Sequence, residues 1–416
     1  MSEVIETRCC IAGGGPSGMM LGFLLARAGL GVLVLEKHAD FLRDFRGDTI
    51  HPSTLDVMYE LGLLDEFLQC PHEELKAIAA QVGGETVILG DFTRLPTRCK
   101  FLVLMPQWDF LDFIAEHARK CPAFQLKLNA EVTDLIEENG AIIGLQAQTP
   151  TGALEVRADL TVGADGRRSI VRARAGLEVL PIGAPMDVMW MRLSRKADDP
   201  QQTFGHAEAG RILVLINRDA YWQCAFVIPK GSADEVRQRG ISAFQRQIAD
   251  MEPFLCDRVE ELHDWNQVSL LTVAVDRLKN WSRPGLLCIG DAAHAMSPIG
   301  GVGINLAIQD AVAAANVLSP KFRVGVPSPE DLRAVQERRT FPTVTTQRLQ
   351  VAIQNRVIRR VLGSSKPLKL PWQFRLLNLF PSLRRIPARI VGMGFRPDHV
   401  APFIAKPAPS ESHGAA

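Results

Sequence analysis

The 416-residue sequence predicts an α/β fold with a doubly wound sheet, an inserted antiparallel β-sheet and a helical C-terminal segment. Three patterns predict it. A glycine-rich turn at residues 13–18 stands between an apolar strand and a helix, and a second glycine turn stands at residues 290–305. Between them, residues 185–275 alternate apolar and polar side chains, which is typical of an antiparallel sheet with two unlike faces.

The first glycine turn lies in a βαβ unit of the expected size. Arg8–Ala12 is continuous and apolar and predicts a buried strand. Met19–Ala28 predicts a helix, and Val32–Leu35 predicts a second strand that ends at Glu36. This arrangement predicts a Rossmann-like nucleotide-binding domain.

Each glycine of the first turn has a physical role in holding a pyrophosphate. Gly13 permits the tight turn, Gly15 lets the backbone approach the phosphates, and Gly18 lets the helix pack on the strand. The helix N-terminus offers N–H groups and the positive end of its dipole to the anion. Glu36 can accept hydrogen bonds from a ribose diol, and its charge disfavours a 2′-phosphate there.

The second glycine turn follows the apolar strand Leu286–Ile289 and opens into an alanine-rich helix predicted over Asn305–Leu318. Two such turns about 270 residues apart indicate a long cofactor that is held at both ends, which points to FAD. The turn comprises Gly290, Asp291, His294, Pro298, Gly300, Gly301, Gly303 and Asn305.

Composition excludes some classes of function. A net charge of +1 gives no case for nucleic-acid binding. Residues 321–400 hold 16 Lys and Arg against 4 Asp and Glu, while residues 1–320 hold 30 against 41. The basic end is expected to dock on the acidic body, and contact with an anionic surface is the alternative.

Cysteine usage and apolar runs predict a cytoplasmic protein. None of the eight cysteines forms a Cys-x-x-Cys pair or a metal-ligand spacing, so free thiols in a reducing compartment are expected. The acidic N-terminus lacks the basic region of a signal peptide. The longest apolar runs, such as Met19–Ala26, are too short to span a bilayer, so no transmembrane segment is expected.

Periodicity and turn residues divide the rest of the chain. We expect three parts of the nucleotide-binding domain at 1–75, 105–180 and 276–345, substrate-side strands at 76–104, and a substrate sheet at 181–275. A basic helical segment is expected at 346–400 and a disordered tail at 401–416. The expected helices are Pro52–Leu61 (capped by Ser53), Phe110–Arg119, Asp234–Met251 and Pro329–Leu362 interrupted at Pro342; the expected strands are Gln125–Leu128, Val132–Glu137, Ile142–Gln148 and Leu154–Val162.

Over roughly residues 5–345 the chain resembles the single-component FAD-dependent monooxygenases of the aromatic-hydroxylase (para-hydroxybenzoate hydroxylase-like) type. Three motifs carry the resemblance: residues 13–18 with Glu36, residues 163–172 (Gly-Ala-Asp-Gly-x-x-Ser-x-x-Arg), and residues 290–305. The middle motif discriminates best, because plain FAD dehydrogenases generally lack an Asp-Gly at that place.

The resemblance implies which residues meet the cofactor. The 13–18 turn would hold the pyrophosphate, Glu36 the adenosine ribose, Val132 the adenine through its backbone, and Asp291 the ribityl chain. The implied cofactor-binding set is Gly13, Gly15, Pro16, Ser17, Gly18, Glu36, Lys37, Arg46, Gln107, Val132, Asp165, Asp291, Pro298, Gly301, Gly303, Ile304 and Asn305.

The implied activity is hydroxylation or epoxidation of a largely apolar, aromatic small molecule by NADPH or NADH and O2, through a flavin hydroperoxide. Such chemistry needs a dry, oriented pocket more than acid–base groups, so no catalytic side chain and no metal is predicted. His294 is expected to pack beside the flavin turn rather than act as a base. With no second nucleotide-binding unit, NAD(P)H is expected to bind transiently on the surface.

Substrate-side residues are harder to assign. Tyr221 and Trp222 are neighbours on a predicted strand and therefore point to opposite faces, and the sequence leaves open which face meets the substrate. The pocket candidates are His51, Trp190, Arg192, His206, Tyr221 and Trp222.

Alternatives stay open at this point. An FAD-dependent reductase or dehydrogenase of a prenyl or quinone-like substrate shares the flavin motifs, and so does a flavin-binding accessory protein without turnover. Residues 356–396 interleave arginines with apolar side chains. They are expected to pack on the body, with peripheral membrane contact or an oligomer contact as alternatives, and the chain is expected to be a monomer or homodimer.

Overall fold

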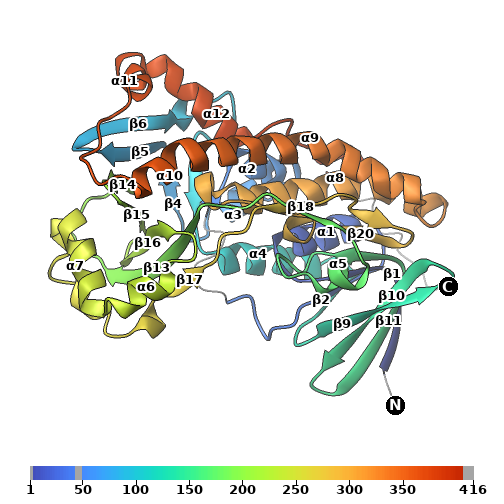
Figure 1. Cartoon of the computed structure of the whole chain (residues 1–416). Coiled ribbons are helices and arrows are strands. Elements are labelled where there is room, and N and C mark those ends of the chain that lie inside the picture. Colours follow the sequence, from blue (N-terminus) through green and yellow to red (C-terminus); the bar gives the residue numbers. More distant parts are fainter. Residues whose placement is uncertain (1–2, 43–48, 406–416) are drawn as a thin grey trace.

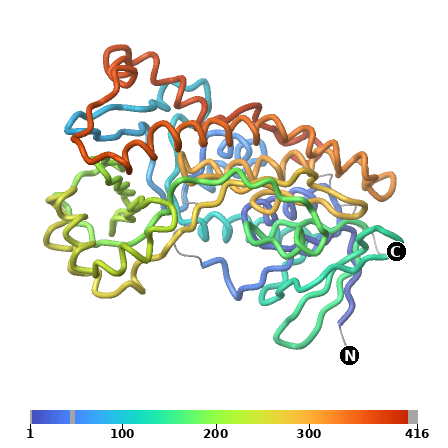
Figure 2. Tube along the Cα trace, viewed as in Figure 1, coloured from blue at the N-terminus to red at the C-terminus, as the bar shows by residue number. Residues whose placement is uncertain are grey.

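A computed structural model describes residues 3–42 and 49–405, and Figures 1 and 2 show their arrangement. One lobe is an eight-stranded sheet flanked by helices. Its central strands β1 (Glu3–Ala12) and β11 (Gly152–Gly163) run parallel, and β2 (Val32–Leu35) pairs parallel with β1. Both faces of these strands are covered, which explains why they read as continuous apolar runs. The order is β19-β20-β11-β1-β2-β8, with β19 (Ser282–Arg283), β20 (Leu286–Cys288) and β8 (Phe124–Lys127) completing it.

The strand predictions for this lobe are confirmed to within a few residues. β9 (Glu131–Glu138) and β10 (Ala141–Thr149) form an antiparallel hairpin that extends the sheet from β11. Asn139 and Gly140 both have positive φ, 51° and 78°, as a two-residue hairpin turn of the predicted Asn-Gly type requires.

Helices pack on this sheet and carry the glycine turns. α1 (Pro16–Arg27) packs against α4 (Gln107–Arg119) and α8 (Val302–Val324), and α8 packs in turn against α9 (Pro329–Ile353). α2 (Pro52–Glu60), α3 (Leu64–Phe67) and α5 (Ile170–Arg174) complete the lobe. In Figure 1, α8 and α9 run side by side across the top of the lobe.

The second lobe is a seven-stranded sheet in the order β17-β13-β16-β15-β14-β5-β6. All its pairings are antiparallel except β14 with β5, which brings residues 77–91 into the same sheet as residues 186–271. Its strands are β5 (Ala77–Val82), β6 (Glu85–Asp91), β13 (Met186–Ser194), β14 (Phe204–Glu208), β15 (Arg211–Asn217), β16 (Tyr221–Pro229) and β17 (Ser269–Leu271).

Two small sheets lie between the lobes. One joins β3 (Thr49–Ile50), β7 (Leu102–Leu104) and β4 (Glu73–Leu75). The other joins β12 (Val179–Pro181), β18 (Asp276–Leu278) and β21 (His294–Ala295), so the chain segments that enter and leave the second lobe are paired with the second glycine turn.

Two helix predictions were wrong in detail. The single helix expected at Asp234–Met251 is two, α6 (Ala233–Gln238) and α7 (Ile241–Met251), because Gly240 takes a φ of 85° between them. α9 continues through Pro342, since buried side chains on both sides of the proline hold the helix in place. The interruption comes later, as a π-helical turn at Gln354–Ile358 before α10 (Arg359–Leu362).

The C-terminal segment packs on the body. α12 (Arg385–Met393) places Ala388 against Gly90 of β6, and α11 (Trp372–Leu379) lies along the same strand. Residues 401–405 belong to the fold rather than to a disordered tail, because α13 (Pro402–Ala405) buries Ile404 and Arg27 donates to its carbonyls. The short 3-10 turns are Phe92–Arg94, Pro253–Leu255, Val259–Glu261, Trp265–Gln267, Gly290–Ala292, Ile299–Gly301 and Pro381–Arg384.

One described helix, over Ile299–Val324, is long and apolar enough to cross a bilayer. The apolar runs of the sequence did not predict such a helix. However, 78% of its apolar window is buried inside the fold, as in the core helix of a globular protein. All eight cysteines are free thiols, and five of them are buried.

Candidate cofactor and substrate site

The first glycine turn has the geometry that its sequence predicts. Gly13 has a φ of 106°, and a side chain there would meet the Ala164 carbonyl oxygen at 2.4 Å. A Cβ at Gly18 would lie 2.0 Å from the Gly13 oxygen. These two glycines are therefore required by the packing of β1, β11 and α1, whatever the turn binds.

Gly15 is different, because its backbone does not need glycine. Its φ and ψ are −74° and −178°, and nothing lies within 4 Å of the position its Cβ would take. It is the N-cap of α1 and no side chain caps the helix, with Pro16 in the first turn. The open space in front of an uncapped helix N-terminus fits a pyrophosphate.

Glu36 ends β2 beside this turn. One of its carboxylate oxygens accepts a hydrogen bond from the Gly14 N–H at 2.9 Å, and the other accepts from the His38 N–H at 3.1 Å. Lys37 is exposed next to it. The Ala130 N–H donates to the Glu36 carbonyl, which brings the start of β9, and with it Val132, to the same end of the sheet.

The second glycine turn lies directly against the first. A Cβ on Gly290 would lie 2.6 Å from the Ser17 hydroxyl of α1, so the two motifs meet in space. Beyond Pro298, Gly300 and Gly301 have positive φ and are exposed and half-buried. With Gly303 and Ile304 they form the N-terminal turn of α8, where backbone N–H groups are available to a ligand.

The carboxylate of Asp291 is about one-third exposed between the two turns. Its Oδ2 accepts a hydrogen bond from Arg167 Nε at 3.0 Å. Arg167 belongs to the Asp-Gly motif at residues 163–172, so this ion pair links the second and third motifs. The sequence alone indicates no role for Arg167, because only the fold brings it to Asp291.

Asp165 of the same motif contacts the first turn of α5, whose N-cap residue is Ser169. The Oδ2 of Asp165 accepts from the Val171 N–H at 3.1 Å in that turn, and burial raises the pKa of the Asp165 carboxyl. Arg172 pairs with Asp276 of β18 at 3.4 Å. The motif therefore braces the junction between the lobes.

His294 belongs to a buried network of polar contacts. It is buried, and its Nε2 lies 2.6 Å from Asp310 Oδ2, which also accepts from the Gly290 N–H at 3.1 Å. Asp310 Oδ1 pairs with Arg339 at 2.8 Å, and Arg339 pairs with Asp398 at 2.9 Å. Burial opposes ionisation of Asp310, but His294 and Arg339 outweigh it and lower its pKa.

Asn305 and His51 hold the second glycine turn against α2. The Asn305 side chain accepts from the His51 N–H and the Thr54 hydroxyl, each at 2.8 Å, and donates to the Thr49 carbonyl at 2.9 Å. His51 Nδ1 lies 2.7 Å from the Val391 carbonyl, and burial lowers its pKa to about 4, so the ring is neutral. His51, not Ser53, is the N-cap residue of α2.

The two faces of the second sheet separate the pocket candidates. Trp190, Ala225 and Val227 pack on the face that also contacts Ile299 of the second glycine turn. Strand alternation places Arg192 and Tyr221 on that face too, and the Arg192 guanidinium lies 4.9 Å from the centre of the Tyr221 ring. This face is turned toward the second glycine turn, and α10 with the residue before it covers part of it through Ile358, Val361 and Leu362.

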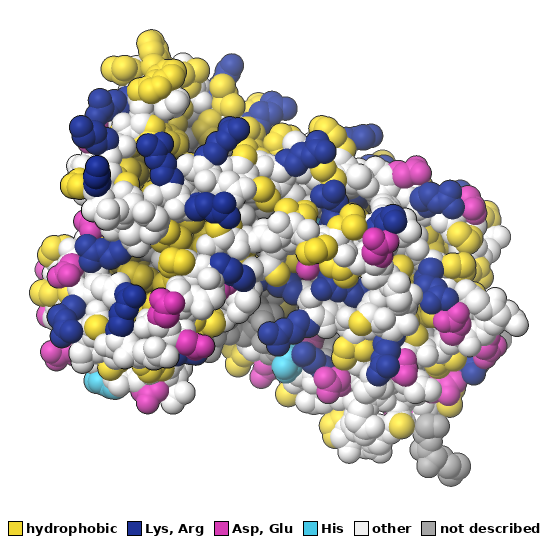
Figure 3. Space-filling model, viewed as in Figure 1, with side chains coloured by type: hydrophobic (Ala, Val, Ile, Leu, Met, Phe, Trp, Pro, Cys, Tyr) yellow, Lys and Arg dark blue, Asp and Glu magenta, His cyan; other side chains and the backbone are white. Residues whose placement is uncertain are grey.

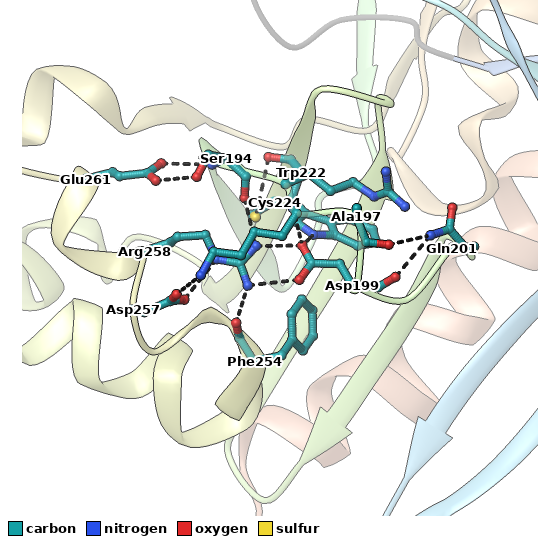
Figure 4. A network of polar contacts seen from close by, with 12 residues as sticks. Ser194, Ala197, Asp199, Gln201, Trp222, Cys224, Phe254, Asp257, Arg258 and Glu261 are labelled. Atoms are coloured by element: carbon teal, nitrogen blue, oxygen red, sulfur yellow. Dashed lines mark hydrogen bonds and ion pairs between the residues drawn. The ribbon is translucent and has the colours of Figure 1, made fainter.

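Trp222 and His206 lie on the other face, beneath α7. Trp222 is fully buried, and its Nε1 donates to Asp199 at 2.8 Å, while Arg258 binds the same carboxylate at 2.6 and 2.9 Å (Figure 4). His206 Nδ1 lies 2.8 Å from Glu252, which raises the pKa of His206. Both side chains serve the core of the sheet.

Glu73 was not predicted from the sequence. It is half-buried in β4, and one carboxylate oxygen is buried without a partner among the described residues. Burial raises its pKa to about 7, against the opposing effect of Arg218 and Arg195. Arg218 Nε also donates to Gln223 at 3.0 Å, next to Tyr221. Only tertiary packing brings β4 to this end of the sheet.

Gln107 and Arg46 are two further residues expected to bind the cofactor. Gln107 is the first residue of α4 and is half-buried, so its side chain stands at the end of the helix that packs on α1. Arg46 lies outside the described residues.

Known sequences match most of this chain. The profile of the family described as "FAD binding domain" matches residues 6–348. A 6-methylpretetramide 4-monooxygenase of Streptomyces rimosus is 34% identical over 387 residues, covering 92% of each chain.

Solved structures share the fold at lower identity. The p-nitrophenol 4-monooxygenase PnpA of Pseudomonas putida DLL-E4 superposes with a TM-score of 0.76 at 22% identity, covering 95% of this chain and all of that one. The anhydrotetracycline hydroxylase OxyS of Streptomyces rimosus has a TM-score of 0.74 at 21% identity, covering 93% and 76%.

Proposed function

Because this chain belongs to the FAD binding domain family and is an FAD-dependent monooxygenase, we propose that it hydroxylates a largely apolar, polycyclic aromatic small molecule. The observation that carries the substrate class is the 6-methylpretetramide 4-monooxygenase, which matches over nearly the whole of both chains. The half-buried aromatic side chains of Trp190 and Tyr221, on the sheet face toward Ile299, support it, because flat aromatic substrates gain from packing on aromatic rings.

In this proposal FAD lies along the two glycine turns. Gly15 and the N-terminus of α1 bind the pyrophosphate, Glu36 the adenosine ribose, and Asp291 the ribityl hydroxyls. The chemistry that FAD supplies is uptake of a hydride from NADPH or NADH and activation of O2 for transfer of one oxygen atom. The N-terminal turn of α8 stabilises negative charge beside it through its N–H groups and dipole.

The protein's own part is to orient the substrate. Arg192 stacked on Tyr221 presents a cation and a phenol to a polar edge of the substrate. Trp190 and its apolar neighbours hold the ring system and exclude water. Substrate hydroxyl groups would lie toward the polar end, where Glu73 and Arg218 stand.

The test is turnover with labelled oxygen. Purified holoenzyme would receive NADPH or NADH, 18O2 and either a tetracyclic polyketide phenol such as 6-methylpretetramide or a one-ring phenol such as p-nitrophenol. We expect 18O in the tetracyclic product and little in the small phenol. Equal labelling of both would refute the polycyclic preference. NAD(P)H oxidation that reduces a quinone substrate without incorporation of 18O would support the reductase alternative instead.

We also propose that the enzyme acts in the cytoplasm as a monomer that contacts anionic membrane surface peripherally through residues 366–389. α11 and α12 pack on β6 but leave five large side chains exposed: Trp372, Leu379, Phe380, Leu383 and Ile386. Hydrophobic side chains gather over α11 with Lys and Arg around them (Figure 3). Six basic and no acidic residues lie in this segment, which favours anionic lipid over a second copy of the same surface.

Vesicle flotation distinguishes contact with anionic lipid from contact with a second copy of this chain. We expect wild-type protein to float with vesicles containing phosphatidylserine and not with pure phosphatidylcholine, and the Trp372→Ser/Phe380→Ser double variant to remain unbound. The control is Val324→Ser, which replaces an exposed apolar residue at the C-terminal end of α8. A dimer in sedimentation that the double variant abolishes, without flotation, would overturn the lipid assignment.

A further inference from the structure

A cavity of about 370 Å³ opens between α9 and the strands that connect the two lobes. Its lining carries three arginines, Arg277, Arg348 and Arg356, beside a short apolar strip. The remaining lining residues are Ile182, Gln347, Val351, Ala352 and Asn355. The volume is in the range of small-molecule sites.

Within residues 3–42 and 49–405, no ion pair joins any of these arginines to an aspartate or glutamate. Arg348 and Arg356 are exposed and Arg277 is half-buried, with Arg277 Nη1 donating only to Gln347 Oε1, at 3.2 Å, among the described residues. Asp276, the neighbour of Arg277, is engaged by Arg172. Residues 338–397 contain no aspartate or glutamate at all. Like charges held together without compensation favour binding of an anion.

The cavity is rigidly connected to the second glycine turn by glutamines of α9. Gln347 donates to the Asp276 and Ala295 carbonyls at 2.8 and 3.2 Å. Gln350 donates to the Ser297 and Ile299 carbonyls at 3.0 and 2.9 Å, and Gln354 to the Ser297 hydroxyl at 2.7 Å. Residues of α9 and of the π-helical turn after it therefore both support the second glycine turn and line the arginine cavity, and Gln347 does both.

We propose that this cavity binds the adenosine 2′-phosphate of NADPH, and that it makes the enzyme prefer NADPH to NADH. The inference rests on the proposed function for the identity of the co-substrate. A 2′-phosphate carries a charge of about −1.5 to −2 at pH 7 and is bound best by the forked guanidinium group. Ile182, Val351 and Ala352 supply an apolar strip for the adenosine.

The place of the cavity suits an extended dinucleotide. Its nicotinamide must reach the flavin beside residues 298–303, while its far end must be held elsewhere, since the chain shows no second nucleotide-binding βαβ unit. The π-helical turn at Gln354–Ile358 widens the helix where Asn355 and Arg356 project. Figure 3 shows Lys and Arg side chains along the ridge that α9 and α10 form.

Binding of 2′,5′-ADP and 5′-ADP to the holoenzyme, measured by calorimetry, tests the site without turnover or aromatic substrate. We expect wild-type protein to bind 2′,5′-ADP at least tenfold more tightly than 5′-ADP. The Arg348→Ala/Arg356→Ala variant should lose that difference, and the Arg348→Lys/Arg356→Lys variant should retain part of it. The control is Arg333→Ala, an exposed arginine of α9 that pairs with Glu330 instead.

Anaerobic reduction of the bound flavin supplies the second readout. The NADPH concentration for half-maximal bleaching should rise at least tenfold in the double alanine variant, with the limiting rate and FAD content unchanged and the NADH values unaffected. Equal binding of the two nucleotides by wild-type protein, or an unchanged NADPH requirement in a folded, yellow double variant, would overturn the proposal. Because neither assay contains the aromatic substrate, a wrong substrate class would leave both results intact.

Discussion

Arg167 Nε donates to Asp291 Oδ2 at 3.0 Å, which joins two turns that stand 124 residues apart in the chain. Each side chain is about one-third exposed, so the ion pair lies at the surface rather than in the core. We propose that the other carboxylate oxygen of Asp291 binds a ribityl hydroxyl of FAD.

Replacing Asp291 by alanine should weaken FAD retention by about 1–3 kcal/mol, because a charge-assisted hydrogen bond to the ribityl chain is lost. The Kd for FAD is measured by fluorescence after removal and titration of the cofactor. Asp250→Ala, an exposed aspartate on α7, is the control. An unchanged Kd in Asp291→Ala would remove this residue from the cofactor site.

Valine at Gly15 should abolish FAD binding without unfolding the protein. The extended backbone at this position accepts a β-branched residue, and the new side chain would project into the open space where we propose that the pyrophosphate binds. Absorbance at the flavin band reports the cofactor and circular dichroism reports the fold. Gly205→Val in β14, whose Cβ would only touch Val214 at 3.9 Å, is the control, and it should remain yellow. A yellow Gly15→Val protein would contradict the placement.

Asp310→Asn should destabilise the fold by about 3–5 kcal/mol, because it leaves the buried Arg339 without part of its compensating charge. Urea denaturation measures the free energy of unfolding. Arg333→Ala, which removes an exposed pair on the same helix α9, should change it by less than about 0.5 kcal/mol. Similar small effects from both substitutions would show that the buried network contributes little.

Glu73 should make stability fall with rising pH. Its pKa of about 7 in the folded protein exceeds the ordinary 4.5, so the folded state holds a proton that the unfolded state has released. Its contribution is therefore fully favourable below pH 4.5 and is lost as pH rises to 7. Glu73→Gln should gain about 1 kcal/mol relative to wild type between pH 5 and 8, after allowance for partial exposure. The control is Glu74→Gln, at the exposed neighbouring position. Its free energy of unfolding should change with pH in the same way as that of the wild type.

Neighbouring residues of β16 should separate stability from catalysis. Trp222→Phe loses the buried hydrogen bond to Asp199 and should cost about 1–3 kcal/mol of stability with kcat/KM nearly unchanged. Tyr221→Phe should leave the unfolding free energy within about 0.5 kcal/mol but lower kcat/KM. The reverse pattern would place the substrate on the α7 side of the sheet.

Local sequence patterns were sufficient for the cofactor lobe. Glycine spacing, the flanking apolar strands and the acid at Glu36 predict β1, α1 and β2, because each depends on backbone conformation and burial within about 30 residues. The same locality explains the hairpin at Asn139-Gly140. The resemblance carried by the three motifs then predicts FAD as the cofactor and the family to which the chain belongs.

Features that depend on contacts between distant segments of the chain could be determined only from the tertiary structure. Strand alternation separates Tyr221 from Trp222, but which face looks toward Ile299 is set by how the sheet packs on the cofactor lobe. Gly240 breaks a helix while Pro342 does not, because the second is held by buried neighbours on α9. The partner of Asp291 lies 124 residues away and those of Arg339 lie 29 and 59 residues away, and no local pattern encodes such distances.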